Sequence, residues 1–274
     1  MGSWLKNLDR VLRGEATRLA ALRGEDLDIP AGGLSAVVVV LAMLYGVCMG
    51  CYAVFQPGRP IFWQMLASTL KAPALFYLTL AVTFPSLYVF NTLVGSRLSI
   101  PAVFRLLIAS LAVNVAVLAS FGPIVAFFSL STTSYPFMVL LNVAMFAVSG
   151  GLGLAFLLQT LHRMTLASRL TAAAGWPATM PTGDASSPPQ DAGAVPAQLV
   201  EEPGALETTP GHVLGKQVKM VFNCWVVIFA LVGAQMGWVL RPFIGAPGTP
   251  FEWFRERKSN FFQAVLQTLA GLFS

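Results

Sequence analysis

The chain has 274 residues, of which 56% are hydrophobic and only 11% are charged. Soluble domains carry about 25% charged residues, so this composition excludes a soluble globular protein and predicts an integral membrane protein. The formal net charge of +5 does not predict nucleic-acid binding, because cations beside membrane spans set topology and contact anionic headgroups. No aspartate or glutamate occurs between Asp28 and Asp184, as expected where a carboxylate cannot be solvated.

Residues 1–30 precede the first apolar stretch and are predicted to form a basic amphipathic helix on the cytoplasmic side. Apolar residues recur there at helical spacing: Leu5, Leu8, Leu12, Ala16, Leu19 and Leu22. The basic residues between them are Lys6, Arg10, Arg13, Arg18 and Arg23. Such a helix is suited to lie on an anionic membrane surface. Packing against other cytoplasmic parts is the alternative.

Five transmembrane helices are predicted from the apolar segments, at about residues 33–55, 74–94, 104–127, 136–161 and 220–240. No Lys, Arg, Asp or Glu occurs at positions 106–162. That tract would be about 85 Å long as one helix and must therefore fold back. The polar sequence from Ser129 to Pro136 is the expected turn. The predicted fold is all-α, a polytopic membrane helix bundle with a four-span core at 31–171 and a fifth span within 214–241.

Residues 172–213 are rich in Ala, Pro, Gly and Ser and contain few large apolar side chains, which predicts a flexible linker. Five spans place the two termini on opposite sides of the membrane. With a cytoplasmic N-terminus, the cytoplasmic segments hold eleven Lys and Arg residues and the opposite side holds six. The positive-inside rule therefore predicts the N-terminus inside and the C-terminus outside, with a bacterial inner membrane as the expected location.

Two short amphipathic segments on the outer side, 61–71 and 259–274, are predicted to be interfacial helices. In the first segment, Gln64, Ser68 and Lys71 share one helical face. The second segment is too short to cross a bilayer. Both are rich in aromatic or aliphatic side chains on the opposite face, so they are expected to form an aromatic collar at one headgroup level.

The predicted spans lack the side chains from which most membrane enzymes and ion pumps build a site. Their central turns contain no Asp, Glu, Lys or Arg, and both histidines, His162 and His212, lie at or beyond a span end. Serine catalysis needs a base beside the nucleophile, and metal sites need clusters of His, Cys or carboxylates. Cys48 and Cys51 form a C-x-x-C pattern, which we interpret as apolar packing because mid-bilayer disfavours a thiolate. The sequence therefore predicts neither an enzyme nor a bound cofactor or metal.

Amide side chains are the main polar groups within the predicted spans: Asn91, Asn114, Asn142, Gln159, Asn223 and Gln235. We interpret them as interhelical hydrogen-bonding groups, with a polar path for a small solute as the alternative. Close helix packing is predicted where glycines repeat at four-residue spacing, which are Gly46 with Gly50 and Gly233 with Gly237. Pro85 is expected to kink the second span.

The C-terminal segment, residues 242–274, follows the fifth span and is rich in aromatic and basic side chains. The candidate interface residues in and beside it are Arg241, Pro242, Phe243, Trp253, Phe254 and Arg255. Aromatic residues and arginine are common anchors at protein interfaces. The same residues suit anchoring to lipid headgroups, and the sequence leaves these two alternatives open.

Three local sequences accompany the five-span layout: the lead-in helix from Leu8 to Gly14, the segment from Pro85 to Tyr88, and Phe121-Gly122-Pro123. Together they resemble the bacterial branch of the Yip-type multi-span membrane proteins over residues 1–170. This resemblance implies five spans, a cytoplasmic N-terminal segment and a non-enzymatic organiser or adaptor without catalytic residues. The long linker and the extended C-terminus depart from that family's pattern.

Two functions follow as hypotheses. The first is a non-enzymatic integral membrane scaffold or accessory subunit that binds other membrane proteins, lipid or further copies of itself. The second is a small-solute channel or carrier lined by the membrane amides. Replacing Asn114 and Asn142 by leucine should abolish flux under the second hypothesis and alter only stability or assembly under the first.

Overall fold

A computed structural model describes residues 2–14, 31–55, 62–93, 100–174, 216–245, 249–256 and 259–273. Every regular element in these ranges is an α-helix, which confirms the predicted all-α fold. The helices are α1 (Gly2–Leu12), α3 (Ala31–Phe55), α4 (Phe62–Leu93), α5 (Ile100–Ser120), α6 (Gly122–Ser131), α7 (Tyr135–Ala174), α8 (Lys216–Val239) and α9 (Phe261–Phe273). The linker predicted at 172–213 lies almost wholly outside the described residues.

Four stretches of the described helices are long and apolar enough to cross a membrane: Ala31–Phe55, Phe62–Ser86, Val103–Ser131 and Tyr135–Leu161. They support the prediction of a multi-pass integral membrane protein with a four-span core. In α8 the described apolar part, Cys224–Val239, is shorter than these four. The fifth span therefore stays a prediction.

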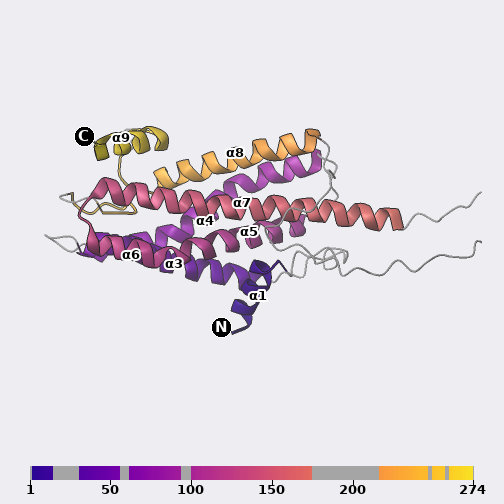
Figure 1. Ribbon diagram of the computed structural model, residues 1–274, viewed down its shortest axis with the longest axis horizontal. Helices are drawn as coiled ribbons and strands as arrows, with labels where there is room; N and C mark the ends of the chain where they lie inside the picture. Colours follow the sequence, from indigo (N-terminus) through magenta and orange to yellow (C-terminus); the bar gives the residue numbers. More distant parts are fainter. Residues whose placement is uncertain are drawn as a thin grey trace, which may run out of the picture.

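Helix α3 lies toward one edge of the bundle, beside α5, whose side chains are mostly buried (Figure 1). It packs against α4, α5 and α6, while α7 packs against α5 and α8 packs against α4. The buried side chains of α3 recur every three or four residues, at Leu34, Val38, Ala42, Tyr45, Met49 and Tyr52. This spacing places them on one helical face, which explains how a uniformly apolar helix is oriented in the bundle.

The two ends of the chain are attached to different parts of the bundle. Helix α1 packs against α3 and α5, with Leu8 and Val11 buried on its inner face. Helix α9 contacts α7 and α8 and lies near the end of the bundle at which α7 begins (Figure 1). Exposed Phe262, Leu266 and Leu269 give α9 an apolar outer face, as expected of an interfacial helix. Its position at the membrane interface stays a prediction.

The third span contains a break that the sequence analysis did not anticipate. Helix α5 ends at Ser120, Phe121 forms a turn, and α6 begins at Gly122 with Pro123 in its first turn. Proline has no N–H to donate to the preceding turn, so a continuous helix would leave a carbonyl without its partner. The turn predicted between the third and fourth spans is present, because α6 ends at Ser131 and α7 begins at Tyr135. Its Ser134 hydroxyl accepts a hydrogen bond from the Phe137 N–H at 3.4 Å, as an N-cap does.

The prediction of a separate interfacial helix at 61–71 is wrong, because residues 62–71 form the first turns of α4. Helix α4 continues from Phe62 through Pro73 and Pro85 to Leu93, and its apolar span begins at Phe62. Gln64, Ser68 and Lys71 are only 2%, 0% and 4% exposed. They do not face water, because another segment of the chain covers them. The prediction of an aromatic collar formed by two interfacial helices is therefore wrong for the first of the two.

Candidate functional site

The covering segment is the stretch that follows α8, which we call the C-terminal strap (residues 241–245 and 249–256). Pro242, Ile244 and Gly245 of the strap are buried. On α4, Gln64, Ser68 and Lys71 stand at spacings of four and three residues and therefore share one face, the polar face of α4. Each of these three side chains donates to a backbone carbonyl of the strap.

The amide and hydroxyl of the polar face bind the start of the strap. Gln64 Nε2 donates to the carbonyl oxygens of Pro242 at 3.0 Å and Phe243 at 3.1 Å. The Ser68 hydroxyl also donates to the Phe243 carbonyl. A buried carbonyl without a donor is destabilising by about 1–3 kcal/mol, so these bonds fix the path of the chain where it leaves α8.

Lys71 is the charged member of the polar face and is 4% exposed. Its Nζ donates to the carbonyl oxygen of Pro242 at 3.3 Å and to that of Trp253. The Phe254 ring centroid lies 4.9 Å from the same nitrogen. An ammonium group has three N–H donors, so two carbonyls and one aromatic face take the place of water around the charge. Among the described residues, Arg13 in the turn after α1 forms an ion pair with Asp9 of α1. Lys71 has backbone carbonyls as its hydrogen-bond partners instead.

The strap is also bonded to itself and to the end of α8. The Arg241 guanidinium lies 3.7 Å from the centroid of the Trp238 ring and donates to the Glu256 carbonyl at 2.6 Å. The Arg255 N–H donates to the Arg241 carbonyl at 3.4 Å. The two halves of the strap are thereby joined, and Trp238 Nε1 reaches the Ser259 carbonyl just before α9.

Close packing against α3 completes the attachment. A Cβ added at Gly245 would lie 2.9 Å from Ala53 Cβ and 3.2 Å from Gln64 Cγ. The absence of a side chain at this position therefore lets the strap lie in the angle between α3 and α4. Ile244 is 6% exposed and belongs to the main hydrophobic core.

The predicted interface residues separate into an inner and an outer group. Pro242 is buried, and Arg241, Phe243 and Arg255 are half-buried and take part in the contacts that hold the strap. Trp253 and Phe254 are 44% and 61% exposed. Exposed aromatic side chains also stand on the first turn of α4, where Phe62 is 61% and Trp63 is 63% exposed. We call these four exposed residues the aromatic surface: Phe62, Trp63, Trp253 and Phe254.

The amides of the membrane interior differ in how they are bonded. Asn142 on α7 is 4% exposed and accepts a hydrogen bond from the Tyr45 hydroxyl of α3 at 2.8 Å. Its Nδ2 donates to the Met138 carbonyl at 2.8 Å. Asn142 is thus an interhelical hydrogen-bonding group, as the first of the two interpretations has it. Gln235 is half-buried, and the side chains of Asn91 and Asn223 lie outside those described.

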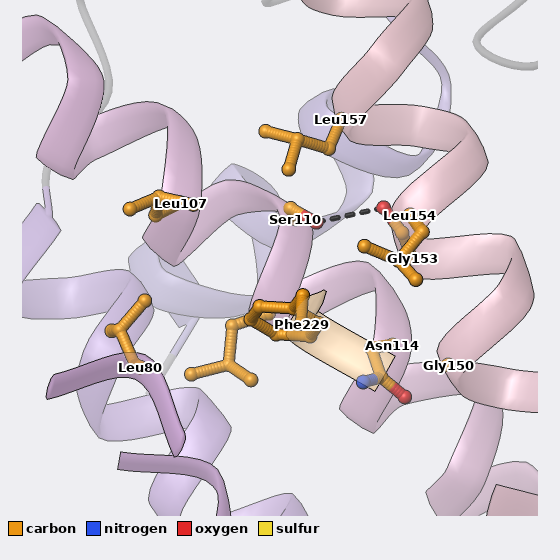
Figure 2. Close-up of a pocket in the computed structure, with 10 residues that line it drawn as sticks. Leu80, Leu107, Ser110, Asn114, Gly150, Gly153, Leu154, Leu157 and Phe229 are labelled. Carbon is orange, nitrogen blue, oxygen red and sulfur yellow. Dashed lines mark hydrogen bonds between the residues drawn. The ribbon is translucent and has the colours of Figure 1, made fainter. Parts of the chain in front are cut away.

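Asn114 on α5 lies beside a small cavity among α4, α5, α7 and α8 (Figure 2). The cavity has a volume of about 20 Å³ and is lined mainly by leucine side chains, glycines and Phe229. Ser110, one turn before Asn114, donates to the Gly153 carbonyl at 2.7 Å. Asn114 Oδ1 is buried, and no donor of the described residues reaches it.

The two glycine pairs occupy different environments. A Cβ at Gly46 would lie 2.6 Å from the Ser68 carbonyl oxygen, and one at Gly50 would lie 2.6 Å from Met65 Cα. Both glycines therefore bring the backbones of α3 and α4 into direct contact. A Cβ at Gly233 or Gly237 would lie 3.6 Å or 3.9 Å from a side-chain methyl of α4, which is ordinary contact.

The sequence analysis missed the role of the polar face of α4. The shared face of Gln64, Ser68 and Lys71 follows from their spacing, but the segment was predicted to be an interfacial helix instead of part of a span. The signal that favours burial is the combination of Pro242, Gly245 and Pro250 in the strap, which marks an extended chain with free carbonyls.

Comparison of the chain with protein-family models, with curated proteins and with solved structures finds no match. The resemblance to the Yip-type proteins therefore stays a prediction. Among the described residues, no group of three or more His, Cys, Asp or Glu side chains is placed to hold a metal ion.

Proposed function

We propose that this chain is a non-enzymatic integral membrane scaffold or accessory subunit, which binds another membrane protein through the strap and the aromatic surface. The observation that supports this proposal is the buried Lys71, whose ammonium group is bound to strap carbonyls and to the Phe254 ring. A buried charge is retained only where its bonds are well made. Here those bonds fix the position of Trp253 and Phe254.

A fixed surface suits binding better than a mobile one. Ordering a side chain on association costs about 0.5–1.5 kcal/mol, and a surface ordered beforehand avoids that cost. Tryptophan, tyrosine and arginine dominate the side chains whose truncation most weakens protein interfaces. Trp63 and Trp253 are exposed members of the aromatic surface, and they are the expected anchors for the partner.

The first experiment tests whether Lys71 fixes the strap. Lys71→Met removes the ammonium group and leaves the Trp253 carbonyl without its donor, an effect of about 1–3 kcal/mol. Amide hydrogen exchange of peptides covering 249–256 should become at least about tenfold faster. Lys6→Met is the matched control, because Lys6 is exposed on α1, and it should leave this exchange unchanged.

The second experiment identifies the partner. The full-length protein is purified in mild detergent at native expression, and co-purifying proteins and lipids are measured by mass spectrometry. Trp253→Ala should reduce the amount of a reproducible companion protein at least about tenfold, the effect of 1.4 kcal/mol. Trp253→Ala keeps the backbone carbonyl that Lys71 binds, so the strap should stay in place.

The matched control for this loss is Leu231→Ala, because Leu231 is 44% exposed on α8, as Trp253 is on the strap. This variant should retain the companion. A protein that purifies alone, or a companion equally lost in both variants, would contradict the proposal. A second copy of the chain as companion would identify a homo-oligomer, and loss of a lipid alone would assign the surface to headgroup anchoring.

The alternative function, a small-solute channel or carrier, has support from one amide. Asn142 is bonded to Tyr45, whereas Asn114 Oδ1 lies beside a cavity and has no hydrogen-bond donor among the described residues. Asn114→Leu is therefore the informative variant for flux in liposomes, and Asn142→Leu is its control for stability. Flux that Asn114→Leu abolishes and Asn142→Leu retains would favour the carrier over the scaffold.

A further inference from the structure

The cavity beside Asn114 contains two polar side chains among apolar walls. Leu80 of α4, Leu157 of α7 and Phe229 of α8 line it, and α5 provides Ser110 and Asn114 (Figure 2). Helices α7 and α8 have few contacts with each other, and the cavity lies in the region where these two helices and α5 come together. Its position is well inside the apolar spans, so polar groups there depend on local partners.

The two polar side chains differ in the hydrogen bonds that they form. The Ser110 hydroxyl uses its proton on the Gly153 carbonyl at 2.7 Å, and its oxygen still has lone pairs that accept. Asn114 Oδ1 is buried, and no N–H or O–H of the described residues reaches it. Asn142 has the same side chain on a neighbouring helix, and both its oxygen and its nitrogen are bonded. Among the described residues, Asn114 Oδ1 therefore has no counterpart of the Tyr45 hydroxyl that donates to Asn142 Oδ1.

We propose that this cavity is a binding site for one water molecule, which donates a hydrogen bond to Asn114 Oδ1. A cavity needs roughly 10–15 Å³ to hold a water, and this one has about 20 Å³. The volume is sufficient for one water molecule. The Ser110 oxygen is the second acceptor on the cavity wall, and buried waters commonly have two to four polar partners.

The glycines of α7 explain why the site is located here. A Cβ at Gly153 would lie 2.7 Å from Asn114 Cβ and 3.2 Å from the Ser110 carbonyl oxygen. Helices α5 and α7 are therefore in backbone contact at this level, too close for a side-chain donor of α7 to enter. A Cβ at Gly150 would meet no atom within 4 Å, so the space beside Asn114 is left open on the other side of that contact.

The test is nuclear magnetic resonance of the full-length protein in lipid nanodiscs, with nitrogen-15 in asparagine only. The side-chain NH₂ protons of Asn114 should show a cross-peak to water with the sign of a dipolar contact, opposite to that of chemical exchange. The Asn142 NH₂ is the internal control and should show none, because its partners are Met138 and Tyr45. Asn114→Leu assigns the signal by removing it, and Asn114→Ala serves the same purpose where the leucine variant does not fold.

Absence of the Asn114 cross-peak would overturn the proposal, and so would equal cross-peaks at Asn114 and Asn142, which would indicate general entry of water. Ser110→Ala removes the second acceptor and should weaken the Asn114 cross-peak without removing the NH₂ signal. An unchanged cross-peak in that variant would also contradict the site as described. None of these outcomes depends on the strap, so failure here leaves the proposed partner surface separately testable.

Discussion

Helices α3 and α8 are both apolar and both contain a pair of glycines four residues apart, yet they pack in different ways. In α3, Tyr45, Met49 and Tyr52 are at most 1% exposed, because α4, α5 and α6 pack against the face on which they lie. In the described part of α8, from Cys224 to Val239, Trp225 is the one buried side chain. Helix α8 packs mainly along α4, and much of its surface faces outward.

The difference shows that a pair of glycines does not by itself determine how closely two helices approach. Gly46 and Gly50 face the backbone of α4, so no side chain fits there. Gly233 and Gly237 face the methyl groups of Thr79 and Leu75 at 3.6 Å and 3.9 Å. Close backbone approach depends on the surface opposite the glycines. Four predictions test this comparison of α3 with α8, in order of decreasing effect.

Gly46→Leu should have the largest effect, a destabilisation of more than about 3 kcal/mol, at the upper end for overpacking. The first added carbon would lie 2.6 Å from the Ser68 carbonyl oxygen and 2.8 Å from Thr69 Cα, and backbone atoms cannot move aside singly. Unfolding by denaturing detergent measures the loss. Gly32→Leu is the control in the same helix, because its Cβ meets nothing within 4 Å, and equal losses in the two variants would refute the contrast.

Trp225→Ala should loosen α8 while leaving α3 in place. Trp225 is 0% exposed, and its Nε1 donates to Ser86 Oγ at 3.2 Å. The destabilisation should stay below the about 3–5 kcal/mol seen in soluble cores, because lipid is itself apolar. Hydrogen exchange should rise in α8 peptides and not in α3 peptides. A similar rise in both helices would show that α8 is as central as α3.

A double-mutant cycle of Tyr45→Phe with Asn142→Leu should give a smaller, specific coupling between α3 and α7. Hydrogen bonds between membrane helices couple by about 0.6 kcal/mol on average and about 1.7 kcal/mol at most. The Tyr45 hydroxyl and Asn142 Oδ1 are 2.8 Å apart and buried. The control cycle of Tyr45→Phe with Asn114→Leu should give no coupling. A coupling of equal size in the control would show that the measured energy does not come from the bond between Tyr45 and Asn142.

Gly233→Ala comes last in this order, because its effect should be favourable instead of destabilising. Alanine is preferred over glycine in a helix by up to about 1 kcal/mol, and the added methyl would make ordinary contact with Thr79 Cγ2 at 3.6 Å. Gly46→Ala, measured beside it, should destabilise by about 1–3 kcal/mol. The same sign in both variants would break the comparison between the two glycine pairs.

Much of the fold could be predicted from the sequence, because a bilayer accepts only a few kinds of chain. Four of the five predicted spans overlap helices that are long and apolar enough to cross a membrane, although the second is at Phe62–Ser86 instead of 74–94. The turn before Tyr135 lies where the polar residues occur. The helix break at Phe121–Gly122 could have been anticipated from Pro123, which has no N–H to donate. The position of α8 could not, because its apolar surface is compatible with lipid and with protein alike.

The candidate site was only partly predictable. Trp253 and Phe254 were named as interface residues, and they are exposed. The polar face of α4 was assigned to an interfacial helix, and instead it binds the strap. For the amides, the sequence left the same two interpretations open at every position, whereas the structure separates the bonded Asn142 from Asn114.

The sequence by itself determined that this protein lies in a membrane, that it is helical, and that no carboxylate occurs from Ile29 to Gly183. These properties follow from the solvent, since hydrocarbon excludes charge and requires every backbone group to be bonded within the segment. Only the tertiary structure decided which polar groups meet. Lys71 is buried because carbonyls from residues 242 and 253 surround it, and contacts over such sequence distances leave no periodic signal in the chain.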